Sequence, residues 1–127
     1  MQEMRLPASL RVLVVDDHFE AADSLGILLE LRGADVRVVH DGLAAIEAIR
    51  NFRPHVAMLD IAMPGLNGFE VAERLRAEQL MPPLLIAMTG WGHEENRQRT
   101  LAAGFHEHRV KPLDIEALIR RLAEVEV

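Results

Sequence analysis

Five apolar, strand-like runs alternate with five helix-like segments along this chain, and that alternation limits the fold more than any other feature. The strand-like runs are residues 11–17, 35–42, 56–60, 83–90 and 107–110. Each is followed by a segment with apolar residues at helical spacing or with helix-boundary residues, at 19–33, 43–51, 68–78, 93–104 and 115–122. A repeated strand–helix order predicts an α/β fold, a doubly wound five-stranded parallel sheet with five helices on both faces.

The composition of the five runs also predicts the order of the strands. The first, third and fourth runs are apolar almost to their ends, as expected of central strands in a parallel sheet. The second and fifth runs carry polar residues that suit sheet edges: Arg37, His40, His108 and Arg109. The order 2-1-3-4-5, which is the flavodoxin-like order, places these two runs at the edges. The other common order, 3-2-1-4-5-6, would expose the third run instead.

Length and charge limit the classes of protein to consider. The 127 residues fit one domain over residues 11–124, after an N-terminal extension of residues 1–10. A net charge of -6 argues against a nucleic-acid partner, and the absence of cysteine excludes disulfides and thiolate metal sites. The chain has no signal peptide pattern and no run long enough to cross a bilayer, so we expect a cytoplasmic protein that does not contact a membrane.

Polar side chains stand where four of the predicted strands end. Asp16 and Asp17 end the first run, Asp60 the third, Thr89 the fourth, and Lys111 follows the fifth. In open parallel sheets, ligands bind beyond the carboxyl ends of the strands, near the point where the strand order reverses. The sequence therefore predicts a site with three carboxylates, a hydroxyl and an ammonium group at one edge of the sheet.

The predicted site suits a hard metal ion and an anionic group. Three neighbouring carboxylates repel one another unless a cation relieves the repulsion, and an oxygen-only ligand set is typical of Mg²⁺. With Mg²⁺ and Lys111 present, the same edge would attract a phosphoryl group. Asp60, on the central third strand, could then act as the nucleophile that forms an acyl phosphate.

Four motifs in this order resemble those of response-regulator receiver domains of the chemotaxis type: VLVVDD, LDIAMPGLNGFE, MTG and VKP. Each motif is weak alone, but four at the usual spacing are specific. The resemblance covers about residues 11–122. The run from 88 to 114, MTGWGHEENRQRTLAAGFHEHRVKPLD, is most similar to receivers attached to hybrid sensor histidine kinases.

The resemblance implies a phosphoacceptor and a metal site. It implies that Asp60 receives a phosphoryl group from a histidine kinase or a histidine phosphotransfer protein. It further implies that Asp16, Asp17 and Asp60 bind Mg²⁺ together with the backbone carbonyl of Ala62.

The resemblance also implies how the phosphoryl group is held and used. Thr89 and Lys111 would contact it, and the bond between Lys111 and Pro112 would be cis, which is uncommon even before proline. Signalling would pass to a downstream protein partner, from a monomer or weak dimer. Because its chemistry would be confined to its own aspartate, the domain is not expected to be an enzyme.

Three positions bear on how such a receiver would work. Receivers often have Tyr or Phe three residues before the lysine, whereas this chain has His108, whose polarity makes an inward position costly unless it finds a partner. Ala62 and Trp91 would flank the phosphoryl group. Because Ala62 cannot hold a water and Trp91 could cover the approach of one, they predict slow loss of the group.

Two other functions fit parts of the pattern. A haloacid-dehalogenase-type phosphatase also uses a strand-end aspartate with Mg²⁺ and a lysine, but it requires Asp-x-Asp where this chain has adjacent Asp16 and Asp17. A degenerate receiver would serve only as a binding module, yet the residues of the predicted site are all intact. Turnover of a generic phosphomonoester would separate the phosphatase from the receiver.

Overall fold

The computed structural model, which describes residues 4–90 and 94–127, contains five strands and five helices in strict alternation. In chain order they are β1 (Arg11–Val15), α1 (Phe19–Leu31), β2 (Asp35–Val39), α2 (Gly42–Phe52), β3 (Val56–Asp60), α3 (Gly68–Ala77), β4 (Leu84–Thr89), α4 (Glu94–Ala103), β5 (Glu107–Val110) and α5 (Ile115–Ala123). Every predicted element is present. The first strand ends at Val15, however, so Asp16 and Asp17 lie in the loop that follows it.

All strand pairs are parallel, and the sheet has the predicted order β2-β1-β3-β4-β5. Every residue of β3 and β4 is buried, whereas β2 and β5 are partly exposed, as their polar residues predicted. The register pairs Val15 with Leu59 and Asp60 with Met88. The carboxyl ends of β1, β3 and β4 therefore lie side by side.

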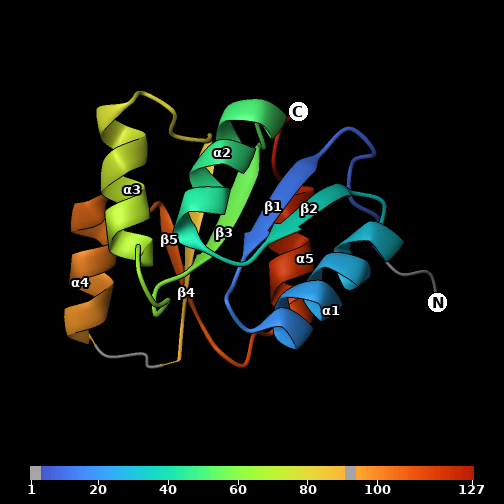
Figure 1. Cartoon of the computed structure of the whole chain (residues 1–127). Coiled ribbons are helices and arrows are strands. Elements are labelled where there is room, and N and C mark those ends of the chain that lie inside the picture. Colours follow the sequence, from blue (N-terminus) through green and yellow to red (C-terminus); the bar gives the residue numbers. More distant parts are fainter. Residues whose placement is uncertain (1–3, 91–93) are drawn as a thin grey trace.

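Helices cover both faces of the sheet, with α1 and α5 on one face and α2, α3 and α4 on the other (Figure 1). Alternate strand residues face opposite sides: Val12 and Val14 pack in the α1–α5 layer, whereas Leu13 and Val15 pack in the α2–α3 layer. These two apolar layers bury both faces of the sheet. None of the described helices has the length and apolar character needed to cross a membrane.

Local signals explain where the helices begin and end. The side chains of His18, Asp41, Asn67 and Asp114 each accept a hydrogen bond from a backbone N–H in the first turn of the helix that follows. After α4 the chain turns at Gly104, whose φ of 114° lies in the left-handed region that favours glycine. The helices thus start close to the strand ends, which brings the connecting loops to the edge where the site was predicted.

Candidate functional site

The polar residues predicted from the sequence meet at the carboxyl edge of the sheet. Asp60 is the last residue of β3 and Thr89 the last of β4, while Asp16 directly follows β1 and Lys111 directly follows β5. Asp16, Asp60 and Thr89 are buried, whereas Lys111 is half-buried. A close-packed parallel sheet thus holds four side chains from distant parts of the chain at one place.

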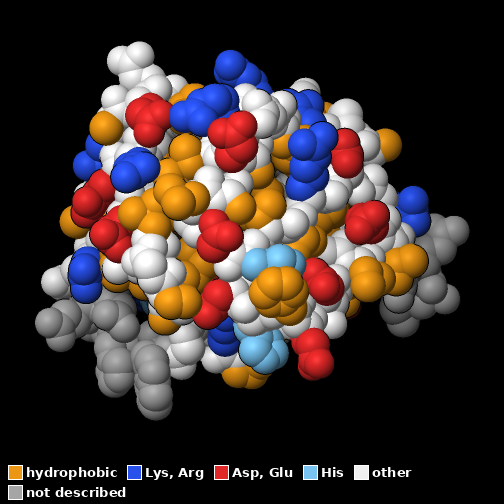
Figure 2. All heavy atoms as spheres, in the orientation of Figure 1, with side chains coloured by type: hydrophobic (Ala, Val, Ile, Leu, Met, Phe, Trp, Pro, Cys, Tyr) orange, Lys and Arg blue, Asp and Glu red, His pale blue; other side chains and the backbone are white. Residues whose placement is uncertain are grey.

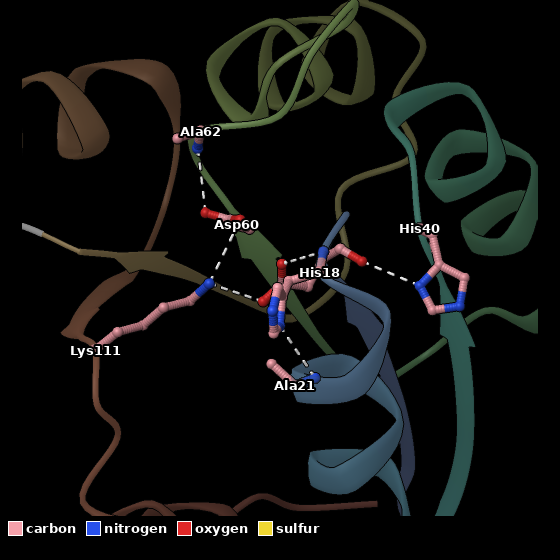
Figure 3. A network of polar contacts seen from close by, with 7 residues as sticks. His18, Ala21, His40, Asp60, Ala62 and Lys111 are labelled. Atoms are coloured by element: carbon pink, nitrogen blue, oxygen red, sulfur yellow. Dashed lines mark hydrogen bonds and ion pairs between the residues drawn. The ribbon is translucent and has the colours of Figure 1, made fainter.

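Lys111 links the two buried carboxylates. Its Nζ donates a hydrogen bond to Asp16 Oδ2 at 2.7 Å and forms an ion pair with Asp60 Oδ2 at 3.4 Å (Figure 3). The carboxylate side chains are 4% and 9% exposed, respectively, so water screens this contact weakly. The ammonium group therefore supplies the positive charge that allows the two acids to lie together.

Backbone and histidine contacts fix Asp16 in place. Its Oδ1 accepts a hydrogen bond from the His18 N–H at 3.0 Å, and its backbone carbonyl lies 3.0 Å from His40 Nδ1 (Figure 3). A carbonyl oxygen can only accept, so Nδ1 of His40 carries the hydrogen. The His40 ring stacks on Phe19 at 3.7 Å between ring centroids. The sequence did not predict that His40 supports the site, since this contact joins residues 24 positions apart.

The surface around His40, beside the carboxyl edge of the sheet, is exposed to solvent. Phe19 keeps 61% of its surface accessible to solvent although it stacks on His40. Figure 2 shows histidine side chains on this face, next to hydrophobic and acidic groups. A partner that approaches the buried carboxylates from this side would meet a mixed aromatic and acidic surface.

The loop after β3 orients Asp60. The Ala62 N–H donates a hydrogen bond to Asp60 Oδ1 at 3.1 Å (Figure 3). The loop closes tightly on itself, because a Cβ added at Gly68 would lie 2.8 Å from the Asp60 carbonyl oxygen and from the Ile61 Cα. Glycine is thus required at position 68 for α3 to begin directly against the strand end.

The electrostatics of the two acids differ. Burial, together with the neighbouring Asp16, raises the pKa of Asp60 to about 6 against the opposing attraction of Lys111. Burial acts in the same direction on Asp16, but hydrogen bonds from Lys111 and the His18 N–H outweigh it and lower the pKa of Asp16. Asp16 therefore ionises at a lower pH than Asp60, whose carboxyl loses its proton only around pH 6.

The donor set fits a hard divalent cation. Asp16, Asp17 and Asp60 each offer a carboxylate oxygen, and these oxygens lie within 4.8 Å of one another. Only oxygen donors are present in this cluster, as Mg²⁺ prefers. Burial and the neighbouring Asp16 raise the pKa of Asp60, and a cation bound by these oxygens would stabilise its charged form. The role of the Ala62 carbonyl as a further ligand stays a prediction.

Thr89 joins this site to β5. Its hydroxyl Oγ1 lies 3.1 Å from His108 Nε2, and its carbonyl accepts a hydrogen bond from the Lys111 N–H at 2.6 Å. The bond between Lys111 and Pro112 is cis, as expected. Trp91, predicted to flank the site, lies outside the described residues.

Comparison with known proteins gives one consistent family. Residues 12–123 match the model of the response regulator receiver domain. The response regulator MprA of Mycobacterium ulcerans is 37% identical over 114 residues, which are 90% of this chain and 49% of that protein. An uncharacterised 14.6 kDa protein of Leptolyngbya boryana is 36% identical over 92% of this chain and 90% of its own length.

A solved structure agrees with the sequence relatives. The chemotaxis protein CheY4 of Vibrio cholerae superposes with a TM-score of 0.85 at 27% identity, over 93% of this chain and 99% of that one. The chain thus spans about half the length of MprA but nearly the whole of CheY4.

Asp60 is expected to destabilise the metal-free protein at neutral pH. Below about pH 4 the carboxyl is protonated in both the folded and the unfolded chain. Between about pH 4 and pH 6 the unfolded chain loses this proton while the folded chain keeps it, so the Asp60 contribution to the free energy of unfolding falls as pH rises. Asp60→Asn should therefore raise the free energy of unfolding by about 3 kcal/mol above pH 6, with little gain below pH 4.

Denaturant unfolding with EDTA at several pH values measures this difference. Asp35→Asn, which changes an exposed carboxyl on β2, is the matched control and should show no such pH-dependent gain. A pH-independent effect of Asp60→Asn would contradict the raised pKa.

Proposed function

This chain belongs to the family of response regulator receiver domains, and we propose that Asp60 is the residue on which it carries the phosphoryl group. Family members are modules of two-component signal transduction rather than enzymes in the usual sense. The observation that carries the proposal is the position of Asp60, at the end of central strand β3, with Lys111 Nζ at 3.4 Å and the Ala62 N–H at 3.1 Å.

The proposed reaction is transfer from a phosphohistidine. A carboxylate oxygen of Asp60 attacks the phosphorus atom, an O–P bond forms, and the P–N bond to the donor imidazole breaks. The leaving imidazole nitrogen takes a proton from solvent. The receiver contributes little covalent chemistry beyond its carboxylate. Most of the rate enhancement therefore comes from positioning and from charge neutralisation.

The neighbouring residues have distinct tasks in this proposal. The Lys111 ammonium pairs with an oxygen of the phosphoryl group as negative charge accumulates there, and the Thr89 hydroxyl donates a hydrogen bond to another. Mg²⁺, held by Asp16, Asp17 and Asp60, would lower the pKa of Asp60 and neutralise phosphoryl charge. Family membership disfavours the phosphatase alternative, as does the adjacent pair Asp16 and Asp17.

The proposed partners follow from this role. The phosphoryl donor is a histidine kinase or histidine phosphotransfer protein of the cytoplasm, and the output is contact with a downstream protein. The match covers only about half of MprA, so the output of that protein does not carry over to this chain. The acidic net charge of -6 supports a protein rather than a nucleic acid as direct partner of this domain.

Helix α4 is the element best suited to transmit phosphorylation. Of its side chains at 97–103, only Thr100 and Ala103 are buried, whereas α2 buries Ala45, Ile46, Ile49 and Phe52. Weakly packed elements open and shift at low cost. We therefore propose that β5, whose His108 contacts Thr89, and α4, which packs beside β5, form the output surface.

Hydrogen exchange should detect this output path. Binding of beryllofluoride with Mg²⁺, a phosphoryl mimic, should change amide exchange over residues 97–108 more than over residues 43–51 in α2. The well-packed α2 is the internal control. Equal changes in both segments would contradict the assignment of α4 and β5.

Phosphorylation itself should depend on Asp60. Incubation with acetyl phosphate and Mg²⁺ should add a single phosphoryl group to the wild-type protein and to Asp35→Asn, as measured by intact mass. Asp60→Asn removes the nucleophilic oxygen and should not be labelled. Retained labelling of Asp60→Asn would refute the assigned phosphoacceptor.

Mg²⁺ binding should depend strongly on Asp17. Both oxygens of Asp16 already accept hydrogen bonds, from the His18 N–H and from Lys111, whereas Asp17 is half-buried in the same cluster. Asp17→Asn should weaken Mg²⁺ binding about tenfold or more in calorimetry, or about 1.4 kcal/mol. Asp35→Asn should bind Mg²⁺ as the wild type does. Equal affinities for all three proteins would show that the metal binds elsewhere.

A further inference from the structure

His108 points inward and contacts the hydroxyl group of the site. It is half-buried on the edge strand β5, and its Nε2 lies 3.1 Å from Thr89 Oγ1. Its other ring nitrogen, Nδ1, is buried and has no hydrogen-bond partner among the residues that the structure describes. The contact joins two residues 19 positions apart, through side chains of the neighbouring strands β4 and β5. Only Nε2 of this ring has a hydrogen-bond partner in the described part of the chain. The position of the ring hydrogen can therefore be inferred from the surroundings of the two nitrogens.

Two neutral forms of the ring are possible, and they have opposite consequences for Thr89. If Nδ1 carries the hydrogen, Nε2 accepts from the Thr89 hydroxyl, and a buried N–H is left without an acceptor. If Nε2 carries the hydrogen, it donates to Thr89 Oγ1, and only a lone pair on Nδ1 is left without a donor. Orphaned buried N–H groups are rarer in proteins than under-used acceptors. The surroundings therefore favour the hydrogen on Nε2.

The charged form of the ring is disfavoured as well. Burial lowers the pKa of His108, and the positive charge of Arg97 on α4 lowers it further. A second ring hydrogen would also leave a buried, charged N–H at Nδ1 without an acceptor. The ring is thus neutral at pH 7, with one nitrogen that can donate.

We propose that His108 is a positioning residue, which donates its Nε2–H to Thr89 Oγ1 and so directs the hydrogen of Thr89 toward the phosphoryl group on Asp60. A hydroxyl has one hydrogen and two lone pairs, so a hydroxyl that accepts from His108 keeps its own hydrogen for another acceptor. A hydrogen bond received at oxygen also polarises the hydroxyl and strengthens its own donation. This inference rests on the proposed role of Thr89 at the phosphoryl group.

The proposal explains how a polar ring is tolerated at this position. Phenylalanine could fill the same space but would leave Thr89 without this donor, whereas His108 supplies it.

Nitrogen-15 NMR of the histidine rings tests the assignment directly, in the unphosphorylated wild-type protein at pH 7. We expect His108 to show a protonated Nε2 and a bare Nδ1. Thr89→Val, which removes the oxygen acceptor but keeps the side-chain shape, should shift the Nε2 resonance of His108. A protonated Nδ1 in the wild type would overturn the proposal whether or not Asp60 is phosphorylated.

Phosphorylation rates test whether the contact between His108 and Thr89 speeds phosphorylation of Asp60. With acetyl phosphate as donor, His108→Phe should be labelled about threefold to tenfold more slowly than the wild type, the effect of one lost neutral hydrogen bond. His108→Gln, whose amide can still donate near the place of Nε2, should recover most of the rate. In a Thr89→Ala background, His108→Phe should have no further effect.

The outcomes separate the two proposals. A wild-type protein that is not labelled at Asp60 would refute the proposed function. Labelling of the wild type together with equal rates for His108→Phe would refute only the positioning role. If His108→Phe slowed labelling equally in the wild-type and Thr89→Ala backgrounds, the effect would be a general structural one. That result would also refute the positioning role.

Discussion

Two buried carboxylates share one ammonium group at the end of the sheet, and the site depends on this contact. Asp16 and Asp60 could not both remain charged so close together without Lys111, which reaches both. Asp16 follows β1, Asp60 ends β3 and Lys111 follows β5. Only a sheet with β3 next to β1 and β5 beyond β4 brings these three residues together. Strand order, apolar layers and tight loops all serve to hold this arrangement.

The contact leaves the two acids in unequal states, and that inequality suits phosphoryl acceptance. Asp16 has its charge stabilised by Lys111 and the His18 N–H, whereas the pKa of Asp60 is raised to about 6. A nucleophile whose ionised form is poorly stabilised by the protein has more to gain from a cation and from bond formation to phosphorus. The buried carboxyl of Asp60 lowers the stability of the fold locally. The apolar burial of strands β3 and β4 offsets this loss.

Sequence patterns predicted the fold well, and they placed the candidate site residues at one edge of the sheet, because both follow from short-range rules. The roles of these residues stay predictions. The apolar runs set the strands, Arg37 and His108 marked the edges, and the strand-end aspartates could only meet at one edge of a parallel sheet. The supporting contacts were not predictable in the same way. That His40 Nδ1 reaches the Asp16 carbonyl, and that His108 turns inward, depends on side-chain packing between separate elements.

Strand β5 shows why those unpredicted contacts matter for signalling. Thr89 is contacted at two points here: its hydroxyl by His108 of β5, and its carbonyl by the N–H of Lys111, the residue directly after β5. Lys111 directly follows β5, so under the proposed function a phosphoryl group that drew Thr89 and Lys111 together would act on β5 at both points. Because β5 is a half-exposed edge strand, packed beside the loosely held α4, a small displacement at the buried site has a direct mechanical path to the surface.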